Sequence, residues 1–109
     1  MNTYQKDVAA ASNGHLLHFS DHARISVSDE QVSTDLGGEA AILNLKNGVY
    51  YGLDSVAARI WDLIRQPRSF RELRDILLGE YAVDALWLES DLRNLLNQLA
   101  NQGLVQIAE

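Results

Sequence analysis

The sequence predicts an α+β domain in which a three-stranded antiparallel meander is followed by three helices. Two tight-turn signals, Gly37-Gly38 and Asn47-Gly48, separate runs that suit β-strands, because these residue types supply the positive φ angles of short hairpins. After Asp54, apolar residues recur at helical spacing in three successive stretches. A chain of 109 residues has room for one such domain.

The start of the chain is predicted to form a mobile tail over residues 1–19, with the folded domain at 20–109, because residues 1–14 are small, polar and aperiodic. His15, His18 and His22 would share one face of a helix and could then bind a metal ion. The surrounding segment has no clear helical pattern and no supporting carboxylate cluster or cysteine. We therefore expect surface or tail histidines and no metal site.

Five extended stretches are predicted, at residues 24–28, 32–36, 39–46, 49–53 and 104–107. Gly37-Gly38 joins the second to the third, and Asn47-Gly48 joins the third to the fourth, so these three strands make the meander. Both of its faces are partly apolar. We therefore expect helices to cover one face of the sheet and the other face to be partly covered.

The last strand of the meander is predicted to have one free side. A two-residue turn before it would place Leu45 opposite Tyr50. Because an antiparallel ladder alternates, Tyr50 and Gly52 would point their N–H and C=O groups away from the 39–46 strand. The 49–53 strand carries neither charge nor proline, the usual devices that protect an exposed edge, so it could accept an added strand.

The three helices are predicted from their caps and periodicity. Asp54 or the residue after it begins the first, and Pro67 ends it. A capping box at Ser69 begins the second, Asp84 caps the third, and Gly103 ends the third. The third helix has a buried stripe of Leu88, Leu92, Leu95, Leu96 and Leu99, next to a rim of Trp87, Asp91, Asn94 and Gln98.

Composition argues against several classes of protein. The net charge of −6 disfavours nucleic acid as a partner. No apolar run approaches the length of a membrane span, so no membrane partner is expected, and a cytoplasmic location is the default. The absence of cysteine excludes disulfides and thiolate metal sites. There is no phosphate-binding glycine loop, zinc helix or nucleophile elbow, so we expect no cofactor and no catalytic residues.

Three helices beside a β-hairpin also describe the winged helix-turn-helix arrangement, so a DNA-binding regulator is one alternative. Its recognition helix should be basic, whereas the third helix here has Asp84, Glu89 and Asp91 against Arg93. A structural subunit of a modifying enzyme, with no peptide site of its own, is a second alternative.

Two motifs resemble the PqqD-like proteins, also called RiPP (ribosomally synthesised and post-translationally modified peptide) precursor recognition elements. They are Leu-Asn-Leu-x-x-Gly-x-Tyr-Tyr-x-Leu-Asp at residues 43–54 and Ile-Trp-x-Leu at residues 60–63. The resemblance spans roughly residues 24–107 and includes Gly-Leu-Val at 103–105. It implies a winged helix-turn-helix-like fold that binds the leader segment of a precursor peptide. The leader would add to the 49–53 strand and lie against the third helix.

The resemblance and the free edge together predict a non-catalytic adaptor that presents the leader to processing enzymes. The length looks most like the stand-alone proteins of lasso-peptide pathways, which act beside a leader peptidase and a cyclase; a radical-SAM enzyme is an open alternative as partner. Outward backbone groups would bind the leader, and side chains of the strand and of the third helix would form pockets. The sequence does not decide which flank of the third helix faces the bound leader. The expected peptide-binding residues are Val49, Tyr50, Tyr51, Gly52, Leu53, Trp87, Leu88, Asp91, Leu92 and Leu95.

Overall fold

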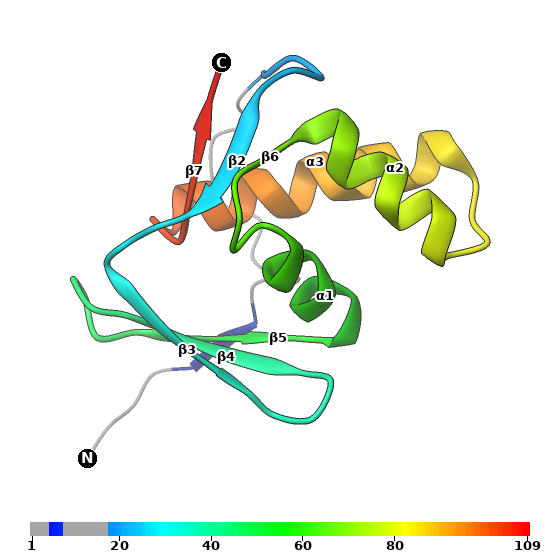
Figure 1. The fold of residues 1–109 in the computed structure, drawn as a ribbon. Helices are drawn as coiled ribbons and strands as arrows, with labels where there is room; N and C mark the ends of the chain where they lie inside the picture. The colour runs from blue at the N-terminus through cyan, green and yellow to red at the C-terminus, as the bar shows by residue number, and fades with distance from the viewer. Residues whose placement is uncertain (1–4, 8–17) are drawn as a thin grey trace.

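The computed structural model describes residues 5–7 and 18–109 of the chain. The described residues form a sheet of order β1-β5-β4-β3, a smaller sheet of order β6-β2-β7, and three helices (Figure 1). The predicted α+β fold, a meander (β3-β4-β5) followed by three helices, is confirmed. The strands are β1 (Gln5–Asp7), β2 (Arg24–Val27), β3 (Gln31–Asp35), β4 (Ala40–Asn44), β5 (Tyr50–Leu53), β6 (Arg68–Ser69) and β7 (Val105–Ala108), and the helices are α1 (Ser55–Leu63), α2 (Phe70–Glu80) and α3 (Ala85–Asn101).

The first hairpin, β3–β4, turns through Gly37-Gly38 as predicted. Leu36 N donates to Glu39 O at 2.8 Å, which closes a two-residue loop. The φ angles of Gly37 and Gly38 are 76° and 98°. Because a side chain is strained at such angles, glycine is the residue type that this turn requires.

The second hairpin, β4–β5, differs from the prediction by two residues in register. Leu43, not Leu45, lies opposite Tyr50. The connection is longer than a two-residue turn, since Gly48 N donates to Asn44 O at 2.9 Å. The Asn-Gly pair correctly marked the hairpin but not the length of its loop.

The shift of two residues keeps every side chain of β5 on its predicted face, because side chains alternate with a period of two. It also preserves the direction of the backbone groups. Asn44 N donates to Val49 O at 3.0 Å, so Val49 faces β4 and the next residue, Tyr50, faces away from it. The same alternation directs the N–H and C=O of Gly52 away from β4.

The helices begin at the predicted caps, but α1 ends at Leu63, before it reaches Pro67. The Asp54 carboxylate accepts from a backbone N–H in the first turn of α1. Ser69 and Glu72 form the complete capping box of α2, and Asp84 caps α3. Gly103, with φ 74°, follows the end of α3. No helix within the described ranges is both long and apolar enough to cross a lipid bilayer.

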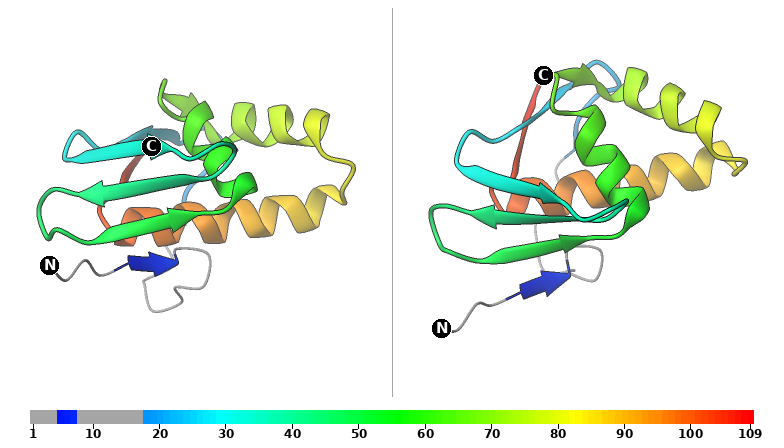
Figure 2. Two further views of the ribbon diagram at one scale, coloured as in Figure 1. Left: turned by 90° about the horizontal axis from the view of Figure 1, so that it is seen from below. Right: turned by 60° about the horizontal axis from the view of Figure 1, so that its bottom comes forward.

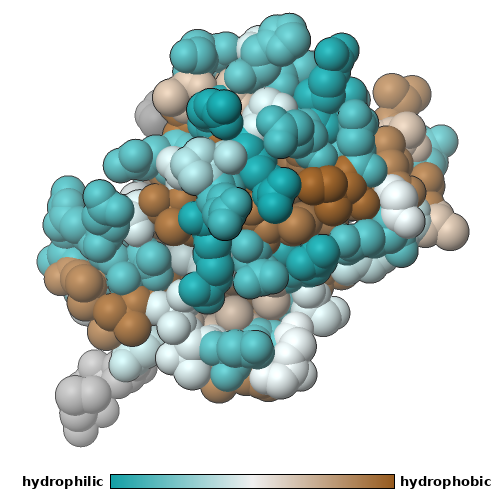
Figure 3. All heavy atoms as spheres, viewed as in Figure 1, coloured by the Kyte–Doolittle hydropathy of each residue, from teal (hydrophilic) through white to brown (hydrophobic). Residues whose placement is uncertain are grey.

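The helices lie on one face of the four-stranded sheet, and Figure 2, in which the sheet comes forward, shows α3 behind β5. The core between them contains Ile42, Tyr51, Trp61, Phe70 and Leu96, all 2% exposed or less. Figure 3 shows apolar surface where α2 joins α3 and near the β4–β5 hairpin. Exposed large apolar residues in those segments are Leu45, Val83, Leu86 and Trp87.

Phe19, which the sequence analysis placed in the tail, belongs to the core. Its ring centroid lies 5.4 Å from that of Phe70 in an edge-on contact. The Arg93 guanidinium lies 4.8 Å from the Phe19 ring and 4.1 Å from the Phe70 ring. A single aromatic residue in a segment without helical periodicity carries no periodic signal, so its burial could not be expected from the sequence.

Two short strands were not predicted. β6 pairs with β2 beside the start of α2. β1 lies in the predicted tail and pairs with β5, so the expectation that the outer side of β5 is unpaired was wrong. The sequence Gln-Lys-Asp has little intrinsic preference for a strand, and only its place against an unprotected edge makes it one.

Candidate functional site

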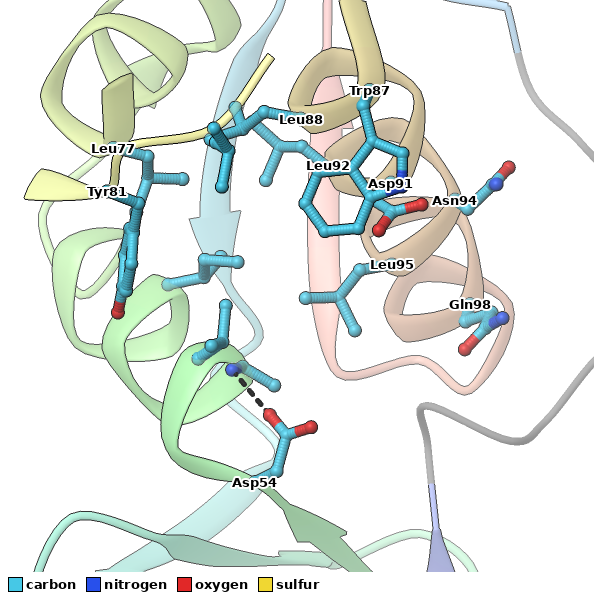
Figure 4. Close-up of a pocket in the computed structure, with 14 residues that line it drawn as sticks. Asp54, Leu77, Tyr81, Trp87, Leu88, Asp91, Leu92, Asn94, Leu95 and Gln98 are labelled. Carbon is cyan, nitrogen blue, oxygen red and sulfur yellow. Dashed lines mark hydrogen bonds between the residues drawn. The ribbon is translucent and has the colours of Figure 1, made fainter. Parts of the chain in front are cut away.

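The candidate site is a cavity of about 510 Å³ between α3 on one side and α1 with the end of α2 on the other (Figure 4). Buried Leu88 and Leu92 of α3 lie at its base, and Trp87 stands at its rim, 58% exposed. An open, mostly apolar cavity with a few polar groups at its edge is typical of a ligand site. The described lining is Asp54, Val56, Ala57, Ile60, Leu77, Tyr81, Val83, Trp87, Leu88, Asp91, Leu92, Asn94, Leu95 and Gln98.

All five site residues expected on α3 line this cavity: Trp87, Leu88, Asp91, Leu92 and Leu95. The flank of α3 that faces the cavity is therefore the one that carries the Trp87 rim. The opposite wall was not foreseen. It comes from apolar residues of α1 and α2, such as Ile60 and Leu77, whose helical spacing the sequence analysis assigned to the core.

The five site residues expected on the 49–53 strand are placed differently. Tyr51 is 2% exposed and Leu53 is 4% exposed, so both side chains are part of the core and none of their surface is free to line a pocket. Val49, Tyr50 and Gly52 are half-buried. The alternation correctly put Tyr51 and Leu53 on one face, and the helices cover that face. The cavity begins at Asp54, directly after β5.

The charge at the cavity is negative. Asp54 and Asp91 are its charged lining residues, and no lysine or arginine is among the described residues that line it. Asp54 Oδ1 accepts from Ala57 N at 2.9 Å, the dashed line in Figure 4, which fixes this carboxylate at the start of α1. Asp91 forms no ion pair within the described part of the chain.

An ion pair braces the α1 and α2 wall. Arg59 Nη2 lies 2.6 Å from Glu80 Oε2, and Arg59 Nε donates to Glu80 Oε1 at 3.0 Å, so the contact is bidentate. The hydrogen bonds from Arg59 lower the pKa of the Glu80 carboxyl, and Glu80 in turn raises the pKa of Arg59. This pair links the middle of α1 to the end of α2.

A second set of contacts fixes the far end of α3 against the sheet. Asn44 is buried, and its Nδ2 donates to Gln102 O at 2.9 Å. Tyr51 OH donates to Gln102 Oε1 at 2.9 Å. We call Asn44, Tyr51 and Gln102 the clasp, because these residues join β4 and β5 to the end of α3.

The outer edge of β5 is occupied by β1. The two strands are parallel, with Gln5 opposite Tyr50, Lys6 opposite Tyr51 and Asp7 opposite Gly52. The outward backbone groups that were expected to receive a peptide are thus paired with the chain's own residues.

Within the described residues, no group of three or more metal-ligating side chains comes together. His18 and His22 are exposed, and His15 lies outside the described residues. What the cavity and the adjacent strand edge can do is bind an extended chain with apolar side chains.

The family model described as "Coenzyme PQQ synthesis protein D (PqqD)" matches residues 39–105. Among solved structures, the chain is similar to that titled "TbiB1 in Complex with the TbiA(beta) Leader Peptide". The identity is 40%, the TM-score is 0.71, and the match covers 74% of this chain and 94% of that one. No curated protein gives a significant match. The matched residues run from β4 through the whole of α3 to the start of β7, well over half of the sequence, and the chain therefore belongs to the PqqD family.

Proposed function

We propose that this protein is a non-catalytic adaptor that binds the leader segment of a ribosomally synthesised precursor peptide. The observation that carries the proposal is the apolar cavity between α3 and α1, which opens at the end of β5. It is supported by the similarity to TbiB1, whose structure contains a leader peptide. The adaptor would present the bound leader to a leader peptidase or another maturation enzyme, with a lasso-peptide pathway as the first candidate.

Strand addition to β5 supplies the register of the bound leader. The N–H and C=O groups of Tyr50 and Gly52 point away from β4, and a leader would bond to them in place of β1. Each backbone hydrogen bond contributes only about 0.5–1.5 kcal/mol net and does not depend on the sequence of the guest. Selectivity must therefore come from side chains.

The cavity supplies that selectivity. Asp54 ends the strand edge and also lines the cavity, so a chain that follows β5 reaches the cavity without a gap. Leu95, which is partly buried, offers apolar contact inside, and Trp87 offers a large indole face at the rim. An apolar leader residue would bury its side chain there.

An adaptor of this kind needs no catalytic residues. By holding the leader, it raises the local concentration of the attached core peptide at the enzyme that acts on it. The gain depends on simultaneous contact with the enzyme, so a surface outside the leader site must serve that second partner.

DNA binding is not favoured by the geometry of α3. Arg93, a basic residue of this helix, is stacked on Phe70 and donates to Phe19 O at 2.7 Å and to Asp21 Oδ1 at 2.9 Å. Its guanidinium is committed to internal contacts, so it is not free to bind a phosphate backbone.

The test is Trp87→Ala, measured by fluorescence anisotropy with labelled candidate leader peptides, the TbiA(beta) leader of the similar structure among them. Taking roughly 200 Å² for an indole side chain, 58% exposure leaves about 120 Å² that a leader could cover, worth about 3 kcal/mol at most. We expect Kd to rise about tenfold to hundredfold. The matched control is Leu86→Ala, one residue earlier and 79% exposed but outside the cavity lining, which should bind like the parent. Equal affinity for the parent and Trp87→Ala would contradict the proposed site.

A further inference from the structure

We propose that β1 is an internal ligand of the leader site, a segment of the chain that occupies the edge of β5 until a leader displaces it. The inference rests on the proposed function in one respect, that leaders use this edge. The occupancy itself is a property of the chain alone. The evidence for this occupancy is the pairing of Gln5, Lys6 and Asp7 with β5.

The register puts Lys6 at the centre of this contact. In a parallel ladder a residue bonds to the two residues that flank its partner. Lys6 lies opposite Tyr51, so its N–H and C=O are directed at Tyr50 and Gly52. These are the same outward groups that strand addition by a leader would need, so β1 and a leader exclude each other there.

The contact covers the edge but not the cavity. Among the described residues, the lining comes from Asp54, the helices and the segment that joins α2 to α3, and no residue of β1 takes part. A leader that uses both edge and cavity makes contacts that β1 lacks, so it can displace β1. A peptide that offers only backbone pairing gains nothing over β1.

The consequence is a lower apparent affinity for every guest that uses the edge, so that a guest needs contacts in the cavity to stay bound. When β1 is paired most of the time, the apparent Kd equals the intrinsic Kd divided by the fraction of molecules with a free edge. Because β1 contributes only a few backbone hydrogen bonds, we expect the apparent Kd to exceed the intrinsic Kd by roughly threefold to thirtyfold. This factor weakens every guest equally, so guests that also fill the cavity remain bound.

The first experiment needs no leader. Lys6→Pro in the full chain removes the N–H that faces β5, whereas Gln5→Pro, the matched control, removes an N–H that faces away from it. Amide hydrogen exchange by NMR should show Gly52 exchanging roughly threefold to thirtyfold faster in Lys6→Pro than in the parent. Gly52 should be unchanged in Gln5→Pro. The amide of Tyr51 faces β4 and serves as an internal reference in every variant.

The second experiment titrates the same three proteins with the labelled leader. We expect Lys6→Pro to bind it more tightly than the parent by the factor seen in exchange, and Gln5→Pro to bind like the parent. Unchanged exchange of Gly52 in Lys6→Pro would overturn the pairing of β1. Faster exchange with unchanged Kd would overturn the competition. If no variant binds the leader, the proposed function fails, while the exchange result still decides whether β1 occupies the edge.

Discussion

Truncation of the buried Asn44 tests whether the clasp holds α3 against the sheet. Asn44 Nδ2 donates to Gln102 O at 2.9 Å, and its Oδ1 accepts from Lys46 N at 2.8 Å. One side chain thus closes the β4–β5 loop and ties that loop to the end of α3. Asn44→Ala removes both hydrogen bonds and adds no bulk.

The expected loss in the free energy of unfolding depends on whether water can reach the group that each lost hydrogen bond leaves unpaired. Lys46 is exposed, so water can replace the bond to its N–H, and the loss there is about 0.5 kcal/mol. The contact to Gln102 lies beside a buried side chain, where an unpaired group costs about 1–2 kcal/mol. The sum is about 2 kcal/mol, which corresponds to a fall in Tm of roughly 10 °C for a domain near 100 residues.

Thermal unfolding followed by circular dichroism measures this cost, with Asn47→Ala as the matched control. Asn47 is also an asparagine of the β4–β5 loop, and its Oδ1 accepts from Val49 N at 2.9 Å, but it is exposed and does not contact α3. We expect its Tm to fall by no more than a few degrees. Equal Tm values for Asn44→Ala and Asn47→Ala would refute the clasp as a tertiary contact.

Three further predictions concern stability. Tyr51→Phe removes the hydroxyl that donates to Gln102 Oε1 and should lower the free energy of unfolding by about 1 kcal/mol in urea titrations, with leader affinity retained. Gly103→Ala should cost about 1 kcal/mol in the same assay, because φ of 74° strains any side chain there. Because Arg59 lowers the folded-state pKa of Glu80 below its ordinary value of 4.5, the Glu80 contribution is present above pH 4.5 and is lost as pH falls through the folded-state pKa. Glu80→Gln should therefore be less stable than the parent near neutral pH, and the difference should shrink below pH 4.5 in urea titrations across that range.

Local chemistry explains which features of the fold could be predicted. Each cap and tight turn depends on a few adjacent residues, so Ser69 with Glu72 and Gly37 with Gly38 are readable without the fold. The register of β4–β5 is not readable in this way. It depends on whether Asn44 closes the loop, and Asn44 does so because its side chain also reaches Gln102, which lies far away in the sequence.

Only the α3 side of the site could be predicted, because the opposite wall also depends on contacts between residues far apart in the sequence. A helical wheel shows that Trp87 and Asp91 lie beside the leucine stripe of α3, and both line the cavity. It cannot show that Ile60 and Leu77 leave a gap opposite them, because a gap is a property of packing between helices. Nor could the sequence show which face of β5 the helices cover, and that choice buries Tyr51.

An edge that receives peptides has two conflicting requirements. It must stay free of proline and charge to accept a guest strand, yet an open edge of that kind also pairs with other copies of the protein. A strand of the chain's own resolves the conflict when it satisfies the backbone of Tyr50 and Gly52 but is easily displaced. Gln5, Lys6 and Asp7 are polar and end before the cavity, so they can hold the edge without filling the site that selects the guest. A longer or more apolar β1 would protect the edge better and would exclude the leader.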